Sequence, residues 1–177
     1  MRNRILVLSA FALLPFATAP AQETRPTPHS VLSIQPLNAV FTAYSAEFER
    51  AVGAAVTLGV GATYFNVGDG IDEVTYKSAD AKLRYYPNGT ALMGFSFGVS
   101  GGYSGVNAVD FSGNKESASA PSFGVLLEYQ WLLGLQRNFA VALGLGAKAI
   151  FINGDRFTSS DFVARYPTAR VSVGYAF

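Results

Sequence analysis

The chain has 177 residues, one histidine, no cysteine and a formal net charge of +1. The lack of cysteine excludes disulfides, thiolate metal sites, cysteine nucleophiles and a lipidated N-terminal cysteine, and a charge near zero excludes the basic field typical of a nucleic-acid-binding protein. Half of the residues are hydrophobic, yet no run approaches the roughly 20 apolar residues that a membrane-spanning helix needs.

The first 21 residues have the pattern of a secretory signal peptide. Arg2 and Arg4 precede an apolar stretch at 5–16, and the small residues at 17–21 suit a signal peptidase that cleaves after Ala21. The apolar stretch is too short to cross a membrane as a helix. We therefore expect an exported chain of nearly neutral charge, in which residues 22–30 form a periplasmic tail that its prolines keep extended.

From Val31 onward, segments of alternating apolar and polar residues are separated by turn signals. This alternation is typical of β-strands, and it lacks the 3.6-residue period of an amphipathic helix. We predict eight strands, at about 30–37, 41–50, 54–66, 75–86, 91–105, 120–132, 138–152 and 166–177. Pro36 has no N–H for a strand ladder, so we expect a bulge or an early strand end there.

The connections between the predicted strands form two sets. Those after the second, fourth and sixth strands are short, whereas those at 67–74, 106–119 and 153–165 are longer and polar. The first connection, near Asn38, is short and breaks this pattern. Short turns at one rim and long loops at the other are typical of outer-membrane barrels, in which the short turns face the periplasm.

Large apolar side chains share one parity in the later strands. Odd-numbered residues at 93–99, 123–131, 139–151 and 169–177 are mostly large and apolar, whereas the even-numbered ones are mostly small or polar. A soluble barrel buries its bulky apolar face, but an apolar face of about nine residues per strand matches a tilted transmembrane strand. In lipid every backbone polar group must also be paired, which requires a closed sheet. We therefore predict an all-β, eight-stranded antiparallel up-and-down transmembrane β-barrel with its apolar face toward lipid.

Aromatic residues are expected at both membrane interfaces of such a barrel. The parity and the strand ends place one group toward the short turns, comprising Tyr85, Tyr129, Trp131 and Tyr175, and another toward the long loops, comprising Tyr64, Tyr103 and Phe151.

The same parity places eight charged side chains in the lumen. They are Glu47, Glu49, Asp80, Lys82, Arg84, Glu128, Lys148 and Arg170. The lumen of an eight-stranded barrel is only wide enough for side chains to fill, and charges in such an interior must pair. Equal numbers of acids and bases favour a plug that fixes strand register, and the alternative is a gate or proton path built from exchangeable ion pairs.

No motif indicates a catalytic, cofactor or metal site. The glycine-rich segments at 59–61 and 98–102 lack the strand–turn–helix context of a phosphate loop, and the acidic loop at 66–73 does not match an EF-hand. Ser159, Ser160 and Asp161 lie together without a base, because the single histidine, His29, falls in the N-terminal tail. We therefore expect no enzyme activity, no cofactor and no bound metal.

Three segments carry a resemblance to a known class of proteins. The last seven residues, which include Val173, Tyr175 and the terminal Phe177, resemble the ends of small outer-membrane β-barrel domains of Gram-negative bacteria, of the OmpA/OmpX-like type, and the segments at 82–87 and 126–131 are similar to strands of that type. The resemblance covers residues 31–177, the expected barrel domain. It implies that the barrel-assembly machinery reads the C-terminal signature and that outer-membrane lipid surrounds the barrel. No peptidoglycan-binding domain follows, so no cell-wall tether is expected.

These observations predict a protein of the cell outer membrane with a structural or interaction role. Its extracellular loops would meet a ligand or protein partner that the sequence does not identify, and nucleic acid is not expected among the partners. A narrow channel or transporter is the first alternative, and a lipid-modifying enzyme is the less favoured one.

Overall fold

The computed structural model describes residues 27–39, 42–67, 74–109, 115–152 and 162–177. The predicted signal peptide at 1–21 and most of the predicted tail lie outside the described residues, as do the central parts of the three long loops. In the part of the chain that is described, one single-turn helix, α1 (Pro36–Ala39), accompanies the strands. No helix among these residues is long and apolar enough to cross a membrane.

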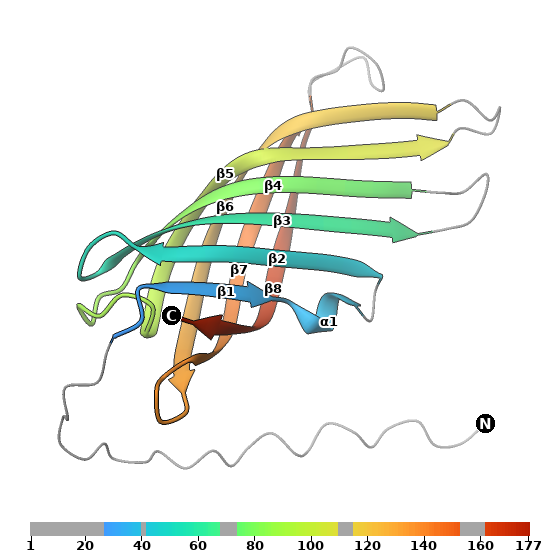
Figure 1. Ribbon diagram of the computed structural model, residues 1–177. Helices are drawn as coiled ribbons and strands as arrows, with labels where there is room; N and C mark the ends of the chain where they lie inside the picture. Colours follow the sequence, from blue (N-terminus) through green and yellow to red (C-terminus); the bar gives the residue numbers. More distant parts are fainter. Residues whose placement is uncertain (1–26, 40–41, 68–73, 110–114, 153–161) are drawn as a thin grey trace, which may run out of the picture.

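Eight strands form a closed barrel in which each strand pairs with its neighbours in sequence and β1 pairs with β8 (Figure 1). All of these pairings are antiparallel. The strands are β1 (Ser30–Ile34), β2 (Ala43–Ala51), β3 (Val56–Val67), β4 (Val74–Tyr85), β5 (Gly94–Val109), β6 (Lys115–Leu133), β7 (Phe139–Ile152) and β8 (Phe162–Ala176). The predicted eight-stranded up-and-down barrel is therefore confirmed.

The strand bounds differ from the predicted ones mainly at the rim of the long loops, which we call the loop rim. β5 and β6 extend to Val109 and from Lys115, so most of the loop predicted at 106–119 is strand, and β8 already begins at Phe162. These extensions carry little apolar alternation, which is the signal that the prediction used. β1 instead ends at Ile34, before Pro36, which begins α1. Early termination was one of the two outcomes expected there, because proline suits the first turn of a helix and not a ladder.

Exposure alternates along the strands with the predicted parity. In β6, Phe123, Val125 and Leu127 are each about half exposed, whereas Ser122 and Glu128 are buried. Every strand carries at least one exposed large hydrophobic residue, and the buried polar side chains lie on the opposite face. Bulky apolar groups therefore face outward and polar groups face inward, which is the reverse of a soluble barrel.

The rim of the short turns, the turn rim, is packed and hydrogen bonded. The carbonyl of Phe177 accepts the N–H groups of His29 and Ser30 at 2.9 and 2.8 Å, and its own N–H donates to the Ser30 carbonyl at 2.9 Å. Inside this end a small buried apolar cluster brings β1, β7 and β8 together with the turn before β5, and its members are Val31, Leu92, Ala140 and Ala176. The inner face was predicted to be mostly small or polar, and the inward position of Leu92 in the turn was not predicted.

Leu92 adopts an unusual backbone conformation, with a φ of 66°. A residue with a branched or bulky side chain rarely adopts a positive φ unless its surroundings hold it there. Here Gln130 Nε2 donates to the Leu92 carbonyl at 2.7 Å, and the leucine side chain is fully buried. The turn thus places an apolar side chain across the end of the lumen.

Closure of the barrel predicts heat-modifiable migration on a detergent gel. The purified full chain should migrate differently before and after boiling, because a closed strand ladder resists detergent at room temperature and opens only on heating. Identical migration of the two samples, at several detergent concentrations, would contradict the closed barrel.

Candidate functional site

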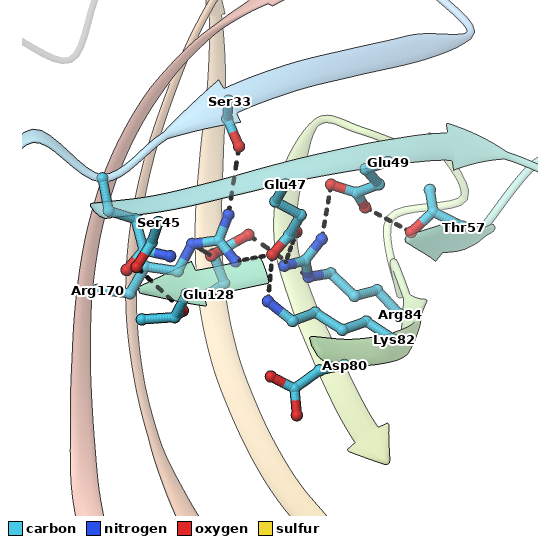
Figure 2. Close-up of polar contacts among 12 residues, drawn as sticks. Ser33, Ser45, Glu47, Glu49, Thr57, Asp80, Lys82, Arg84, Glu128 and Arg170 are labelled. Carbon is cyan, nitrogen blue, oxygen red and sulfur yellow. Dashed lines mark hydrogen bonds and ion pairs between the residues drawn. The ribbon is translucent and has the colours of Figure 1, made fainter. Parts of the chain in front are cut away.

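All eight predicted lumen charges lie on the inner face of the barrel, and the structure divides them into two groups. The first, which we call the central ion-pair cluster, comes from β2, β4, β6 and β8 (Figure 2) and consists of Glu47, Glu49, Lys82, Arg84, Glu128 and Arg170. The second, the upper ion pair, lies nearer the loop rim. It joins Asp80 of β4 to Lys148 of β7, with Nζ–Oδ1 and Nζ–Oδ2 distances of 3.0 and 3.1 Å.

Glu47 is the centre of the central ion-pair cluster. Its Oε1 accepts a hydrogen bond from Arg84 Nη2 at 2.6 Å, and its Oε2 accepts one from Arg170 Nη1 at 2.6 Å and another from Lys82 Nζ. On β3, Gly59 pairs with Glu49 of β2 and Lys82 of β4, and Gly61 pairs with Glu47 and lies next to the Lys82 side chain, since a Cβ added to it would be 3.2 Å from Lys82 Nζ. Because these glycines have no side chains, the acids of β2 reach the bases of β4 across the inner face of β3.

Glu128 joins the two arginines of the cluster from the other side of the lumen. Its Oε2 lies 3.1 Å from Arg170 Nε, and its Oε1 lies 3.6 Å from Arg84 Nε. A Cβ added to Gly144 would lie 3.3 Å from Glu128 Oε2, and one added to Gly98 would lie 3.2 Å from Arg84 Cγ. The small inner residues of β5 and β7 therefore provide the space that these long side chains occupy.

The remaining acid, Glu49, connects the cluster to the turn rim. Arg84 Nη1 lies 2.7 Å from Glu49 Oε2, and Glu49 Oε1 accepts hydrogen bonds from the hydroxyls of Thr57 and Tyr86. Burial raises the pKa of Tyr86, which follows β4 in the turn, well above the ordinary value for a phenol, and the Glu49 carboxylate raises it further. Tyr86 therefore stays protonated and remains a donor to Glu49.

The central ion-pair cluster is neutral and, apart from Lys82, almost completely buried. It contains three acids and three bases, and the side chain of Glu128 is 0 % exposed while that of Arg84 is 1 % exposed. Desolvation of an unpaired charge in such a place costs several kcal/mol. The side chains of the cluster can therefore be ionised in this buried position only because their charges balance.

Several members of this network were not predicted, although the parity that located the charges also pointed to them. Thr57 and Tyr86 bind Glu49, and Gln130 binds the Leu92 carbonyl. The predicted network comprised charged residues only, so neutral donors at inward positions were left out.

A cavity of about 150 Å³ lies inside the barrel next to the central ion-pair cluster, toward the loop rim. Its charged lining residues are one acid and four bases, namely Asp80, Lys82, Arg84, Lys148 and Arg170. The other lining residues include Gln35, Ser100 and Thr168 as well as apolar residues such as Val99 and Leu126. The space is therefore partly polar, and it is large enough for several water molecules.

The predicted C-terminal signature lies on the outer face at the turn rim. Tyr175 and Phe177 are each more than half exposed, and their rings stack with centroids 6.1 Å apart. Val173 pairs with Ile34 at the upper end of the β1–β8 ladder. The aromatic side chains are thus available from outside the barrel, and their recognition by the assembly machinery stays a prediction.

No protein-family model matches the chain, and no curated protein matches it significantly. Among solved structures, the chain is similar to Ail, the attachment invasion locus protein of Yersinia pestis, at 14% identity over 86% of this chain and 100% of Ail, with a TM-score of 0.48. It is also similar to Ail in complex with the heparin analogue sucrose octasulfate, at 13% identity over 85% of this chain and 97% of that chain, with a TM-score of 0.44. The outer membrane protein AlkL, studied by solid-state NMR in DMPC bilayers, is similar at 10% identity over 93% of this chain and 97% of AlkL, with a TM-score of 0.48.

A double-mutant cycle at Glu128 and Arg170 tests the pairing within the cluster. Glu128→Gln alone should lower the free energy of unfolding by about 3–5 kcal/mol, because it leaves two buried arginines short of a counter-charge. The Glu128→Gln/Arg170→Gln double variant should lose less than the sum of the two single variants, with a coupling energy of about 0.5–3 kcal/mol.

The free energies can be read from urea unfolding in lipid vesicles by the fluorescence of the single tryptophan, Trp131. Asp80→Asn with Lys148→Gln, at the partly exposed upper ion pair, provides the matched control and should show a smaller coupling. Additive single effects at Glu128 and Arg170 would contradict the proposed pairing.

Proposed function

We propose that the protein is an outer-membrane barrel with a structural or interaction role, in which the central ion-pair cluster closes the lumen and the loops face partners outside the cell. The observation that carries this proposal is the combination of a bulky apolar outer surface with a buried, charge-neutral interior. A soluble barrel buries its bulky apolar residues instead of exposing them. An open pore has a water-filled lumen and not a lumen filled with buried ion pairs.

The outer surface supports a membrane location. In β6, outward-facing apolar residues continue from Trp131 near the turn rim to Phe123, and Pro121 follows on the same face. About 9–11 residues are what a tilted strand needs to cross the hydrocarbon core of an outer membrane. Tyr129 packs against Trp131 with ring centroids 4.6 Å apart at the turn rim, and Tyr103 and Phe151 lie exposed toward the loop rim, as aromatic girdles would.

The interior supports a closed lumen. The side chains of Glu47, Arg84 and Glu128 are each at most 2 % exposed, so solvent does not reach the centre of the cluster. The apolar cluster around Leu92 lies in the lumen between the central ion-pair cluster and the turn rim. Two successive layers of side chains therefore oppose the passage of ions.

A narrow channel is the second candidate, and the cavity of about 150 Å³ beside the central ion-pair cluster favours it. Lys82 is the most exposed member of that cluster, and it borders the cavity together with the upper ion pair. If the side chains exchanged partners, water could reach further toward the turn rim. A lipid-modifying enzyme is not proposed, because His29 lies at the turn rim beside Phe177, away from the outer leaflet.

Replacing a lipid-facing residue tests the membrane location. Leu127 faces outward near the middle of β6, and Leu127→Arg should lower the free energy of unfolding in lipid vesicles by about 2–4 kcal/mol, since a charge at the bilayer midplane is poorly solvated. The matched control is Arg50→Leu, at an outward position near the turn rim, which should change stability by less than about 1 kcal/mol. Equal effects at both positions would argue against burial of this face in lipid.

Recordings in planar bilayers test the closed lumen. The purified protein should show no steady conductance, because the central ion-pair cluster leaves no aqueous path. The charge-neutral double variant Glu47→Ser/Arg84→Ser removes the centre of the cluster and should give open events of uniform amplitude.

The control for this recording is Arg50→Ser together with Lys77→Ser, two outward-facing bases, which should leave the bilayer silent. Steady conductance in the unmodified protein, lost on Glu128→Gln or Arg170→Gln, would instead favour the channel.

A further inference from the structure

The outer surface of the barrel carries bases but no acid among the side chains that the structure describes. Four acids have described side chains, and all four lie in the lumen, in the central ion-pair cluster or the upper ion pair. Three bases, in contrast, are exposed on the outer face of the strands, namely Arg50, Lys77 and Arg165. Because the lumen charges balance one another, the outer face described here has a net positive charge.

The three outer bases lie near strand ends and not in the middle of the outer face. Arg50 is the residue before the end of β2 at the turn rim, whereas Lys77 and Arg165 each lie three residues after the start of their strands, β4 and β8, at the loop rim. Large apolar side chains occupy the outer face between these levels. In a membrane barrel, bases at such positions meet the headgroup region of the bilayer, where anionic lipid groups are found.

Lys77 differs from the other two bases because it has aromatic neighbours. The register places Tyr44 of β2, Tyr64 of β3 and Lys77 of β4 side by side across three adjacent strands, and we call these three residues the outer row. Both tyrosines are exposed, and Lys77 Nζ lies 5.8 Å from the centroid of the Tyr64 ring. A cation held over a ring in this way keeps its N–H groups available for an acceptor.

The positive charge of Lys77 is not compensated by an acid of the described chain. Every ion pair among the described residues joins lumen side chains, and the described contact of the Lys77 ammonium is with the Tyr64 ring. On its other side Lys77 pairs with Gly105 of β5, which has no side chain to cover it. The ammonium is therefore accessible to an anion that approaches from outside the barrel.

The surface next to the outer row, on its turn-rim side, is recessed. Ala46, Ala62 and Ala79 occupy the next outward positions on β2, β3 and β4 and pair with one another across the three strands. All three are exposed, and the exposed Tyr103 of β5 pairs with Ala79 at the end of this row. Since alanine is much smaller than tyrosine, an alkyl chain can lie over these residues beside the aromatic rings.

We propose that the outer row binds an anionic lipid of the outer leaflet through the phosphate of its headgroup. The phosphate would accept hydrogen bonds from Lys77 Nζ and from the hydroxyls of Tyr44 and Tyr64, and an acyl chain would lie over the adjacent alanines. A lipid suits this surface better than a soluble anion, because the apolar recess continues directly from the basic group. This proposal rests on the proposed membrane location and orientation, which bring the loop rim to the outer leaflet.

The test is photo-crosslinking of the full chain in phosphatidylcholine nanodiscs that contain phosphatidylglycerol with a diazirine on one acyl chain. Labelling should be saturable, should map by mass spectrometry to peptides containing 44–64 and 77–81, and should be displaced by unlabelled phosphatidylglycerol but not by inorganic phosphate. Lys77→Gln should weaken binding by about fivefold, because it removes one charge near the membrane surface, whereas Lys77→Arg should keep binding within about twofold.

Arg165→Gln is the matched control, because Arg165 is an exposed base at the same rim on β8, across the barrel from β4, and it pairs with Ala149 and not with an aromatic residue. It should leave labelling of the outer row within about twofold of the unmodified protein. Equal losses in the two glutamine variants, undiminished labelling of Lys77→Gln, or displacement by inorganic phosphate would overturn the proposal in a chain whose heat-modifiable migration shows a folded barrel. A chain that fails to fold in lipid would instead contradict the proposed function itself.

Discussion

The rest of the structure depends on the pairing of charges that are buried in the lumen. Glu47 can be ionised there only because Lys82, Arg84 and Arg170 surround it, and the arginines can be ionised only because Glu49 and Glu128 complete the balance. The inner faces of β3, β5 and β7 follow from this requirement, since side chains larger than glycine at several positions would collide with the charged groups. The apolar outer face has the same origin, because the filled lumen has no space for the bulky apolar residues.

Alternating segments separated by turn signals predicted eight strands, and parity predicted the inner position of every charged residue of the network. This works because a strand places alternate side chains on opposite faces, and because the outer surface of this barrel and its narrow lumen hold very different residues. The pattern of contacts could not be predicted in the same way. That Glu128 lies between Arg84 and Arg170, or that Asp80 prefers Lys148 to Lys82, depends on the shear of the barrel and on side-chain reach, which the sequence does not display.

The sequence was least informative where the alternation of large apolar residues on the outer face ends. Residues 106–109 and 115–119 resemble a loop in the sequence because they lack alternating large apolar residues, yet they continue β5 and β6. Leu92 was not recognised as an inner residue because a turn with a positive φ changes the direction of its side chain. Pro36 did indicate the end of β1, but the sequence did not show that, among the described residues, the β1–β8 ladder then ends at Val173.

The ion pair between Glu47 and Arg170 joins residues that are 123 positions apart in the chain. It can form only after β8 has come close to β2. Until the barrel closes, Glu47 therefore lacks Arg170 as a partner. The β1–β8 seam that brings them together is also the shortest ladder of the barrel. The ion pairs in the lumen therefore depend on correct closure of the barrel. A sheet that paired out of register at this seam would separate Glu47 and Glu128 from Arg170, and the buried unpaired charges would destabilise the misassembled form.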